Sequence, residues 1–153
     1  MEEPKYTPKQ HLENTKKITK IILSLDDSFK LPNGWTRKEL MIHLWSWDDQ
    51  MLKGCQAKLD GTCESFKFDH QLKGVDYSKW NDMILEEKKN LTFKESKKLF
   101  EDTRKKTIAI FEKIISQPET IADEKSTFRN ENIVSLWMHD KQHLQNAGMK
   151  IDF

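Results

Sequence analysis

Residues 36–51 read TRKELMIHLWSWDDQM, and this stretch carries both the start signal and the apolar stripe of a helix. Thr36 and Glu39 match a capping box, in which each side chain bonds the backbone N–H of the other residue. Inward-facing positions then recur at spacings of three and four residues: Leu40, His43, Leu44, Trp47 and Met51. This period is typical of an amphipathic helix, so we expect a helix that ends near Leu59.

Three more long helices are predicted on either side of this stretch. Helix-capping residues mark their starts and glycine or proline marks their ends, which places them over residues 8–29, 92–116 and 132–147. Residues 117–131 are polar and are predicted to form a loop. On the third long helix the predicted inward positions are Leu99, Thr103, Ile110, Phe111 and Ile114.

The connection between the second and third long helices is unusually long. Residues 60–77 are polar, and a short helix is predicted over residues 78–89. Such a length is uncommon between adjacent antiparallel helices, so it indicates a crossover. No stretch alternates in the manner of a strand. We therefore expect an all-α chain with one domain, residues 1–153. Its predicted fold is a four-helix bundle of up-down-down-up order, with a long crossover containing a short helix between helices two and three.

The charges of the chain nearly cancel, with 26 Lys and Arg against 25 Asp and Glu. This balance argues against nucleic-acid binding, although lysine pairs on the first and third helices left a weak alternative. Eight Phe and five Trp argue against disorder. No apolar run approaches the roughly 18 residues of a membrane-spanning helix. We expect a cytoplasmic protein that associates with neither membranes nor nucleic acid.

Two histidines stand four residues apart in the segment WMHDKQHL, residues 137–144. His139 and His143 therefore share one face of the predicted last helix, and this spacing lets two imidazoles bind one metal ion. The H-D-x-x-H pattern differs by one methylene from the zinc-peptidase pattern H-E-x-x-H. A peptidase reading is disfavoured because residues 144–153 contain no His or Glu as third ligand and because no strand is predicted to align a peptide.

A third histidine, His43, lies on the inward stripe of the second helix. Together with His139 and His143 it could form a three-histidine metal site between facing helices. The alternative is that all three are core or interface residues. His11 is expected to lie roughly 16 Å away from His43 along the bundle, and His70, in the polar connection, is predicted to be a surface residue.

Asp140 falls within the apolar arc of the last helix and has two open interpretations. It could pair with Lys or Arg. It could instead be a catalytic residue, either as a general base or by orienting a metal-binding histidine through its second ring nitrogen. Trp47 and Trp137 could line a pocket beside the histidines, although aromatic residues at helical spacing more often pack in the core.

Two segments resemble the DinB superfamily. Residues 34–48, GWTRKELMIHLWSWD, are similar to its W-[ST]-x-x-[DE]-x-x-x-H segment, and residues 136–144, LWMHDKQHL, resemble its terminal H-[DE]-x-x-H segment. The middle of the chain, residues 77–115, looks like the ClbS/DfsB-type branch. The resemblance implies the same bundle, with a divalent metal ion, zinc or nickel, held by His43, His139 and His143.

Relatives in that superfamily are implied to include transferases and isomerases that use bacillithiol or mycothiol, and a cyclopropane hydrolase that protects against a genotoxin. The expected function is therefore a metal-dependent hydrolase or thiol S-transferase of stress response or detoxification. Its metal would activate water or a low-molecular-weight thiol toward a small-molecule substrate. The alternative is a non-catalytic, ClbS/DfsB-like protein that sequesters a ligand or mediates an interaction. A homodimer is possible, with Trp45 as a contact.

Overall fold

The computed structural model describes residues 5–117 and 130–153, and the ordered elements within them are helices. A short 3-10 helix, Cys63–Ser65, follows the second long helix. The α-helices, in chain order, are α1 (Pro8–Leu23), α2 (Arg37–Leu59), α3 (Asp69–Leu72), α4 (Tyr77–Lys88), α5 (Phe93–Ile115), α7 (Asn130–Val134) and α8 (Trp137–Asn146). The prediction of an all-helical chain is confirmed for the described residues.

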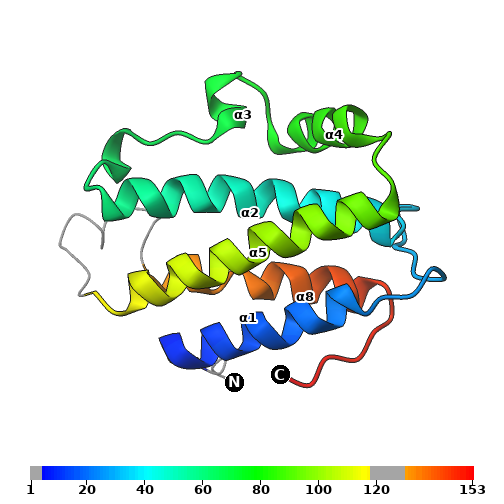
Figure 1. Cartoon of the computed structure of the whole chain (residues 1–153), viewed down its shortest axis with the longest axis horizontal. Helices are drawn as coiled ribbons and strands as arrows, with labels where there is room; N and C mark the ends of the chain where they lie inside the picture. The colour runs from blue at the N-terminus through cyan, green and yellow to red at the C-terminus, as the bar shows by residue number, and fades with distance from the viewer. Residues whose placement is uncertain (1–4, 118–129) are drawn as a thin grey trace.

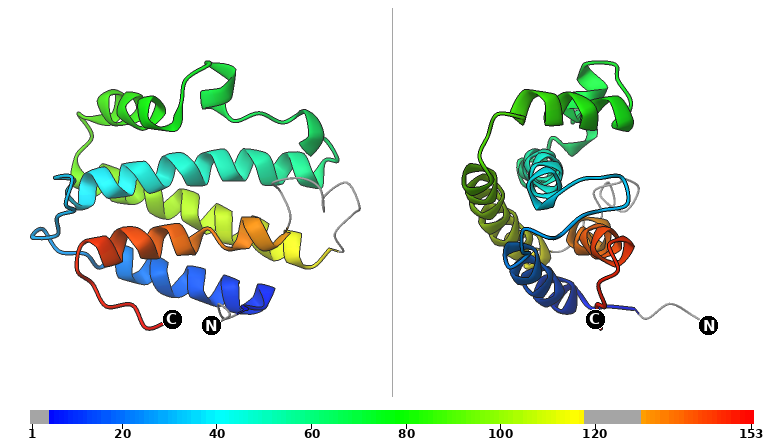
Figure 2. Two further views of the ribbon diagram at one scale, coloured as in Figure 1. Left: turned by 180° about the vertical axis from the view of Figure 1, so that it is seen from behind. Right: turned by 90° about the vertical axis from the view of Figure 1, so that its right-hand side faces the viewer.

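The long helices pack side by side as a bundle. In Figure 1, α2 and α5 run next to each other above α1 and α8, and the end-on view of Figure 2 shows these four helices around a common centre. The two helices of the long connection, α3 and α4, cover the outer face of α2. One apolar core draws buried side chains from all four long helices, among them Ile18, Leu40, Phe100 and Trp137.

Most helix starts follow the predicted signals. Thr7 and Gln10 form a reciprocal capping box at α1, with backbone N–H to side-chain oxygen distances of 2.8 and 3.1 Å. Thr36 and Glu39 form the capping box of α2, and Thr92 accepts the backbone N–H of Glu95 at α5. These bonds satisfy N–H groups that the helix itself leaves unpaired.

The first helix is shorter than predicted, because it ends at Leu23 and not near Phe29. The Ser24 hydroxyl donates to the Ile21 carbonyl at 2.9 Å, and the Asp26 carboxylate accepts the backbone N–H of Ser28 at 2.9 Å. Short polar side chains compete in this way with helical hydrogen bonds. The turn that follows is held from α2, where Arg37 donates to the Leu25 carbonyl at 2.9 Å.

The last helix is divided, where the sequence predicted one helix over 132–147. The break lies at Ser135 and Leu136. There the backbone N–H of Met138 donates to the Ser135 carbonyl at 2.9 Å, and the backbone N–H of His139 donates to the Leu136 carbonyl at 3.1 Å. Such three-residue bonds form a local 3-10 turn. Of the predicted loop over 117–131, residues 118–129 lie outside the described residues.

In the first half of α5 the buried stripe is shifted by one position from the prediction, and it includes Ser96. Leu99 and Thr103 are half-buried, whereas Phe100 and Arg104 are buried. Arg104 is not among the predicted inward positions, and a charged side chain is rarely buried unless it is paired. Ile110, Phe111 and Ile114 are buried as predicted.

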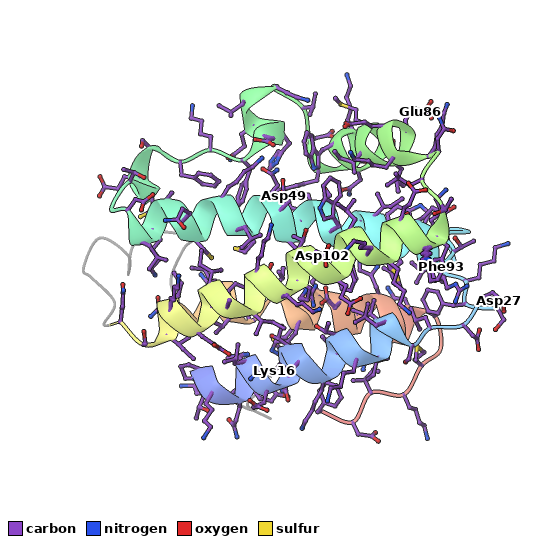
Figure 3. All side chains as sticks on the ribbon, viewed as in Figure 1. Lys16, Asp27, Asp49, Glu86, Phe93 and Asp102 are labelled. Carbon is purple, nitrogen blue, oxygen red and sulfur yellow. The ribbon has the colours of Figure 1, made fainter. Side chains whose placement is uncertain are left out.

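Charged side chains outside the core lie along the helix surfaces. Asp102, labelled on α5 in Figure 3, pairs with Lys98 one turn earlier at 3.0 Å. Lys16, labelled on α1, pairs with Glu13 at 3.3 Å. Exposed pairs of this kind contribute little to stability. Among the described residues, no helix combines the length and the apolar character needed to cross a membrane.

Candidate metal centre

Three imidazoles meet where α2 and α8 lie next to each other. His43 comes from α2, and His139 and His143 come from α8. One ring nitrogen of each lies within 4.8 Å of the others. The Nε2 atoms of His139 and His143 are 3.1 Å apart. In the described part of the chain, this is the one group of three or more His, Cys, Asp or Glu side chains so arranged. The predicted convergence of these three histidines is present in the structure.

The local structure explains the convergence. His139 and His143 are one helical turn apart, which brings their rings edge to face with centroids 4.6 Å apart. His43 lies on the stripe of α2 that faces the bundle, and its ring centroid is 5.5 Å from that of His139 and 5.1 Å from that of His143. Trp35, just before α2, covers the group with its ring centroid 5.0 Å from that of His43.

His43 is the deepest of the three. Its exposed fraction is 5%, and neither Nδ1 nor Nε2 makes a hydrogen bond of normal geometry among the described residues. The Asn81 side chain is the nearest polar partner and slightly opposes the lowering of the pKa of His43. Burying a polar group without a hydrogen bond costs about 1–3 kcal/mol in proteins, and more in a fully apolar medium. A metal ion held by an imidazole nitrogen would meet this requirement.

The surroundings keep the histidines neutral. Burial is the largest cause that lowers the pKa of His43, to about 3, and the nearby imidazoles of His143 and His139 act in the same direction. Burial and then His139 lower the pKa of His143 to about 4. The pKa of His139 is also lowered, mainly by the protein packed around its ring, although the residue lies at the solvent-exposed side of the group. Neutral imidazoles have a free nitrogen lone pair, which is the form that binds metal.

The geometry and donor type fit a transition metal ion. Two nitrogens bound to one tetrahedral zinc ion lie roughly 3.3 Å apart, close to the 3.1 Å between His139 and His143. Imidazole donors suit zinc, nickel, copper or iron and do not suit magnesium or calcium. Three protein ligands leave at least one coordination position open, as in catalytic zinc sites.

A pocket of about 320 Å³ adjoins the histidines. Its lining residues come from α2, from the segment that carries α3 and α4, and from the start of α8. The lining residues are His43, Trp47, Met51, Phe68, Tyr77, Asn81, Leu136 and His139. Trp47 thus lines the pocket, as one sequence interpretation proposed. Trp137 is not among the lining residues and packs in the core.

Asp140 takes part in a second buried polar group. Its Oδ2 accepts from Arg104 Nη1 at 2.8 Å, and Asp48 accepts from the same guanidinium through both oxygens, at 2.5 and 3.0 Å. All three side chains are 1% exposed. Arg104 Nη1 also donates to the Thr19 hydroxyl at 3.2 Å. Of the two roles that the sequence left open for Asp140, the structure contains the ion pair.

Burial and pairing act in opposite directions on the charges of this group. Burial raises the pKa of both carboxyl groups, and Arg104 opposes that effect. Burial alone would lower the pKa of Arg104, but Asp140 and Asp48 raise it. We name this group, Asp48, Arg104 and Asp140, the Asp–Arg–Asp cluster. It connects α2, α5 and α8 directly beside the metal-site histidines.

The remaining two histidines lie outside the site. His11 is buried and accepts the indole N–H of Trp137 through Nδ1 at 2.9 Å, in agreement with the prediction that it does not join His43. The prediction of a surface position for His70 is wrong, since its exposed fraction is 5%. The α3 segment folds over α2 because Gln50 and Asp69 exchange two hydrogen bonds, of 2.8 and 2.9 Å.

Several residues of the site were missed by the sequence analysis. Asn81 lines the pocket and accepts the indole N–H of Trp47 at 3.0 Å. Asp48 and Arg104 carried no local signal, because their significance depends on a partner 56 residues away. Trp45, the proposed dimer contact, is half-buried, and the Lys88 ammonium lies 5.2 Å from its ring centre. The homodimer stays a prediction.

Comparison of the chain with family models, with curated proteins and with solved structures gives no significant match. The resemblance to the DinB superfamily therefore stays a prediction, supported by the residues that suggested it.

Proposed function

We propose that this chain binds one divalent transition metal ion through His43, His139 and His143 and is a metal-dependent enzyme acting on a small molecule. The observation that carries this proposal is the convergence of three neutral imidazoles at the end of a pocket, one of them buried with neither ring nitrogen in a hydrogen bond of normal geometry. A core group of histidines with a structural role alone would have its nitrogens paired with protein groups.

The chemistry proposed for the site is the generation of a nucleophile at neutral pH. A divalent cation bound there would lower the pKa of a coordinated water toward neutrality or ionise a thiol. Because the three ligands are uncharged, they leave the full charge of the ion for this purpose. Trp35 packs against His43 on one side, and on the other side Trp47 lines the pocket together with His43. Substrate would therefore approach through the pocket.

The DinB-like reading of the two histidine segments supports the same assignment. It adds zinc or nickel as the ion, an up-down-down-up order of helices, and hydrolysis or thiol transfer in stress response or detoxification as the reaction. A cytoplasmic location and a low-molecular-weight thiol as cosubstrate belong to this proposal as well. The placement of the three histidines on α2 and α8, beneath the long connection, agrees with that reading.

A ligand-sequestering protein is the second candidate, and one observation favours it. None of the residues that line the pocket is a carboxylate or a lysine that could transfer protons, and Asp140 is paired with Arg104. If Asp140 acts in catalysis, we propose that it does so by orienting α8 through this pair. Tight binding without turnover would favour the second candidate.

The test is the metal content of the purified protein. Protein prepared without chelator should contain close to one zinc or nickel ion per chain, and His43→Ala should lose it because one of three ligands is removed. Gln142→Ala, an exposed position next to His143, is the matched control and should retain the ion. Metal content well below one per chain, unchanged by His43→Ala, would overturn the proposal.

A further inference from the structure

Polar and apolar side chains are unevenly distributed along the pocket beside the histidines. At one end are the imidazoles of His43 and His139, and the rest of the wall is dominated by apolar or aromatic side chains. Trp47, Phe68 and Tyr77 form one continuous group of rings, since the centroid of Trp47 is 6.4 Å from that of Phe68 and 5.4 Å from that of Tyr77. A ligand in this pocket would contact ring faces and edges along most of its length.

The aromatic wall is supported from behind. His70 is buried, and its ring centroid lies 4.7 Å from that of Tyr77, 5.7 Å from that of Trp47 and 5.8 Å from that of Phe68. The indole N–H of Trp47 donates to Asn81, which fixes the orientation of the indole ring. The indole ring is therefore held in place before a ligand arrives, which reduces the entropy lost on binding. Tyr77 is 61% exposed and is held by its ring contacts with Trp47 and His70.

The lining also excludes a class of ligand. No Lys, Arg, Asp or Glu is among the residues that line the pocket, so a charged group placed there would lose water without gaining an ion-pair partner. The one uncharged amide, that of Asn81, has its oxygen engaged by Trp47. The volume of about 320 Å³ lies at the lower end of the roughly 300–1,000 Å³ of small-molecule sites.

We propose that this pocket binds a small, uncharged aromatic molecule, with its ring against Trp47, Phe68 and Tyr77 and its single metal-binding group directed at His43 and His139. The inference rests on the proposed metal centre and names the substrate class of that site. A cosubstrate with several charged groups would keep those groups outside the pocket. Flat aromatic compounds match the wall because aromatic pairs prefer edge and offset contacts at the spacings seen here.

The test compares two ligands that share a metal-binding group and differ by one ring. The probes are benzohydroxamate and acetohydroxamate, titrated into protein loaded with cobalt(II), which accepts imidazole ligands and absorbs visible light. Benzohydroxamate should bind about tenfold more tightly or better, the effect expected from burying one phenyl ring. A third probe, 4-carboxybenzohydroxamate, should lose most of that advantage because its added charge would lie in the apolar wall.

Two neighbouring phenylalanines supply matched variants. Phe68 lines the pocket, whereas Phe66, in edge contact with it at 5.2 Å, does not. Phe68→Ala should bring the ratio of the two affinities toward one, and Phe66→Ala should leave it near the wild-type value. An unchanged cobalt spectrum before ligand addition would show that each variant keeps the metal centre.

The outcomes separate this inference from the function it rests on. Protein that binds cobalt but has equal affinity for the two hydroxamates overturns the aromatic pocket and leaves the metal centre intact. An equal loss of ring preference in both phenylalanine variants also overturns the assignment of the wall. Protein that takes up no cobalt overturns the metal centre and, with it, the proposed orientation of the ligand.

Discussion

Two buried polar groups lie side by side in this bundle and differ in one respect. In the Asp–Arg–Asp cluster, three charged side chains satisfy one another through four short contacts that include Thr19. In the histidine group, His43 is buried to a similar extent, yet neither of its ring nitrogens makes a hydrogen bond of normal geometry among the described residues. The two groups even share helix segments, since Asp140 follows His139 in the chain.

The difference indicates a structural role for the Asp–Arg–Asp cluster and a ligand-binding role for the histidine group. A closed network of charges fixes the relative positions of α2, α5 and α8, and nothing needs to be added to it. The histidine group leaves the ring nitrogens of His43 without a hydrogen bond of normal geometry, adjoins a pocket and holds its members uncharged. A protein keeps such an arrangement when an external group completes it. The first group is therefore interpreted as the support of the second.

The largest effect is expected from Arg104→Met, which removes the charge at the centre of the closed group. Two buried carboxylates would then lack a partner, and the free energy of unfolding should fall by about 3–5 kcal/mol. Urea denaturation measures this loss. Lys105→Met, at an exposed neighbouring position, is the control and should change stability by about 0.5 kcal/mol or less. A loss below about 1 kcal/mol for Arg104→Met would contradict the supporting role.

The next effect concerns completion of the histidine group. Adding zinc to metal-free protein at several hundred times the dissociation constant should raise the free energy of unfolding by about 3 kcal/mol, because only the folded state binds tightly. Thermal denaturation with and without chelator measures it. In Arg104→Met the gain should be smaller if the two groups are coupled. In His43→Ala it should vanish.

Acidification should distinguish the groups further in metal-free protein. The pKa of His43 is about 3 in the folded protein and about 6.5 in the unfolded chain, so between these values the unfolded chain binds more protons. Stability must then fall as pH falls through this window. We expect the His43 contribution to amount to about 1–2 kcal/mol between pH 7 and pH 5. His43→Leu, measured by urea denaturation, should flatten the dependence.

The smallest effect has the opposite sign to the first. His43→Leu in metal-free protein at pH 8 removes two buried nitrogens that make no hydrogen bond of normal geometry and replaces them with apolar atoms. We expect the free energy of unfolding to rise by about 1 kcal/mol, while metal binding is lost. A clear decrease in stability, measured by the same denaturation, would mean that His43 has a structural partner in the folded chain.

Much of the candidate site could be predicted from short-range patterns. His139 and His143 needed only a spacing of four residues on a helix, and His43 needed only its place on the apolar stripe of α2. Both are properties of one helix at a time, and helical periodicity carries them. Predictions that depended on neighbouring chain segments did less well. His70 was expected at the surface, and the helix predicted through Phe29 ends at Leu23.

The sequence by itself determined the positions of the main helices, the inward stripe of α2 and the three histidines that could bind a metal ion. Only the tertiary structure decided that Asp140 pairs with Arg104, 36 residues away, that Asp48 joins them, and that the α3 segment folds over α2 to complete an aromatic pocket. The physical reason is that helical periodicity is encoded locally. A buried charge, by contrast, is tolerated only where partners from other helices meet it, and no single stretch of sequence records that meeting.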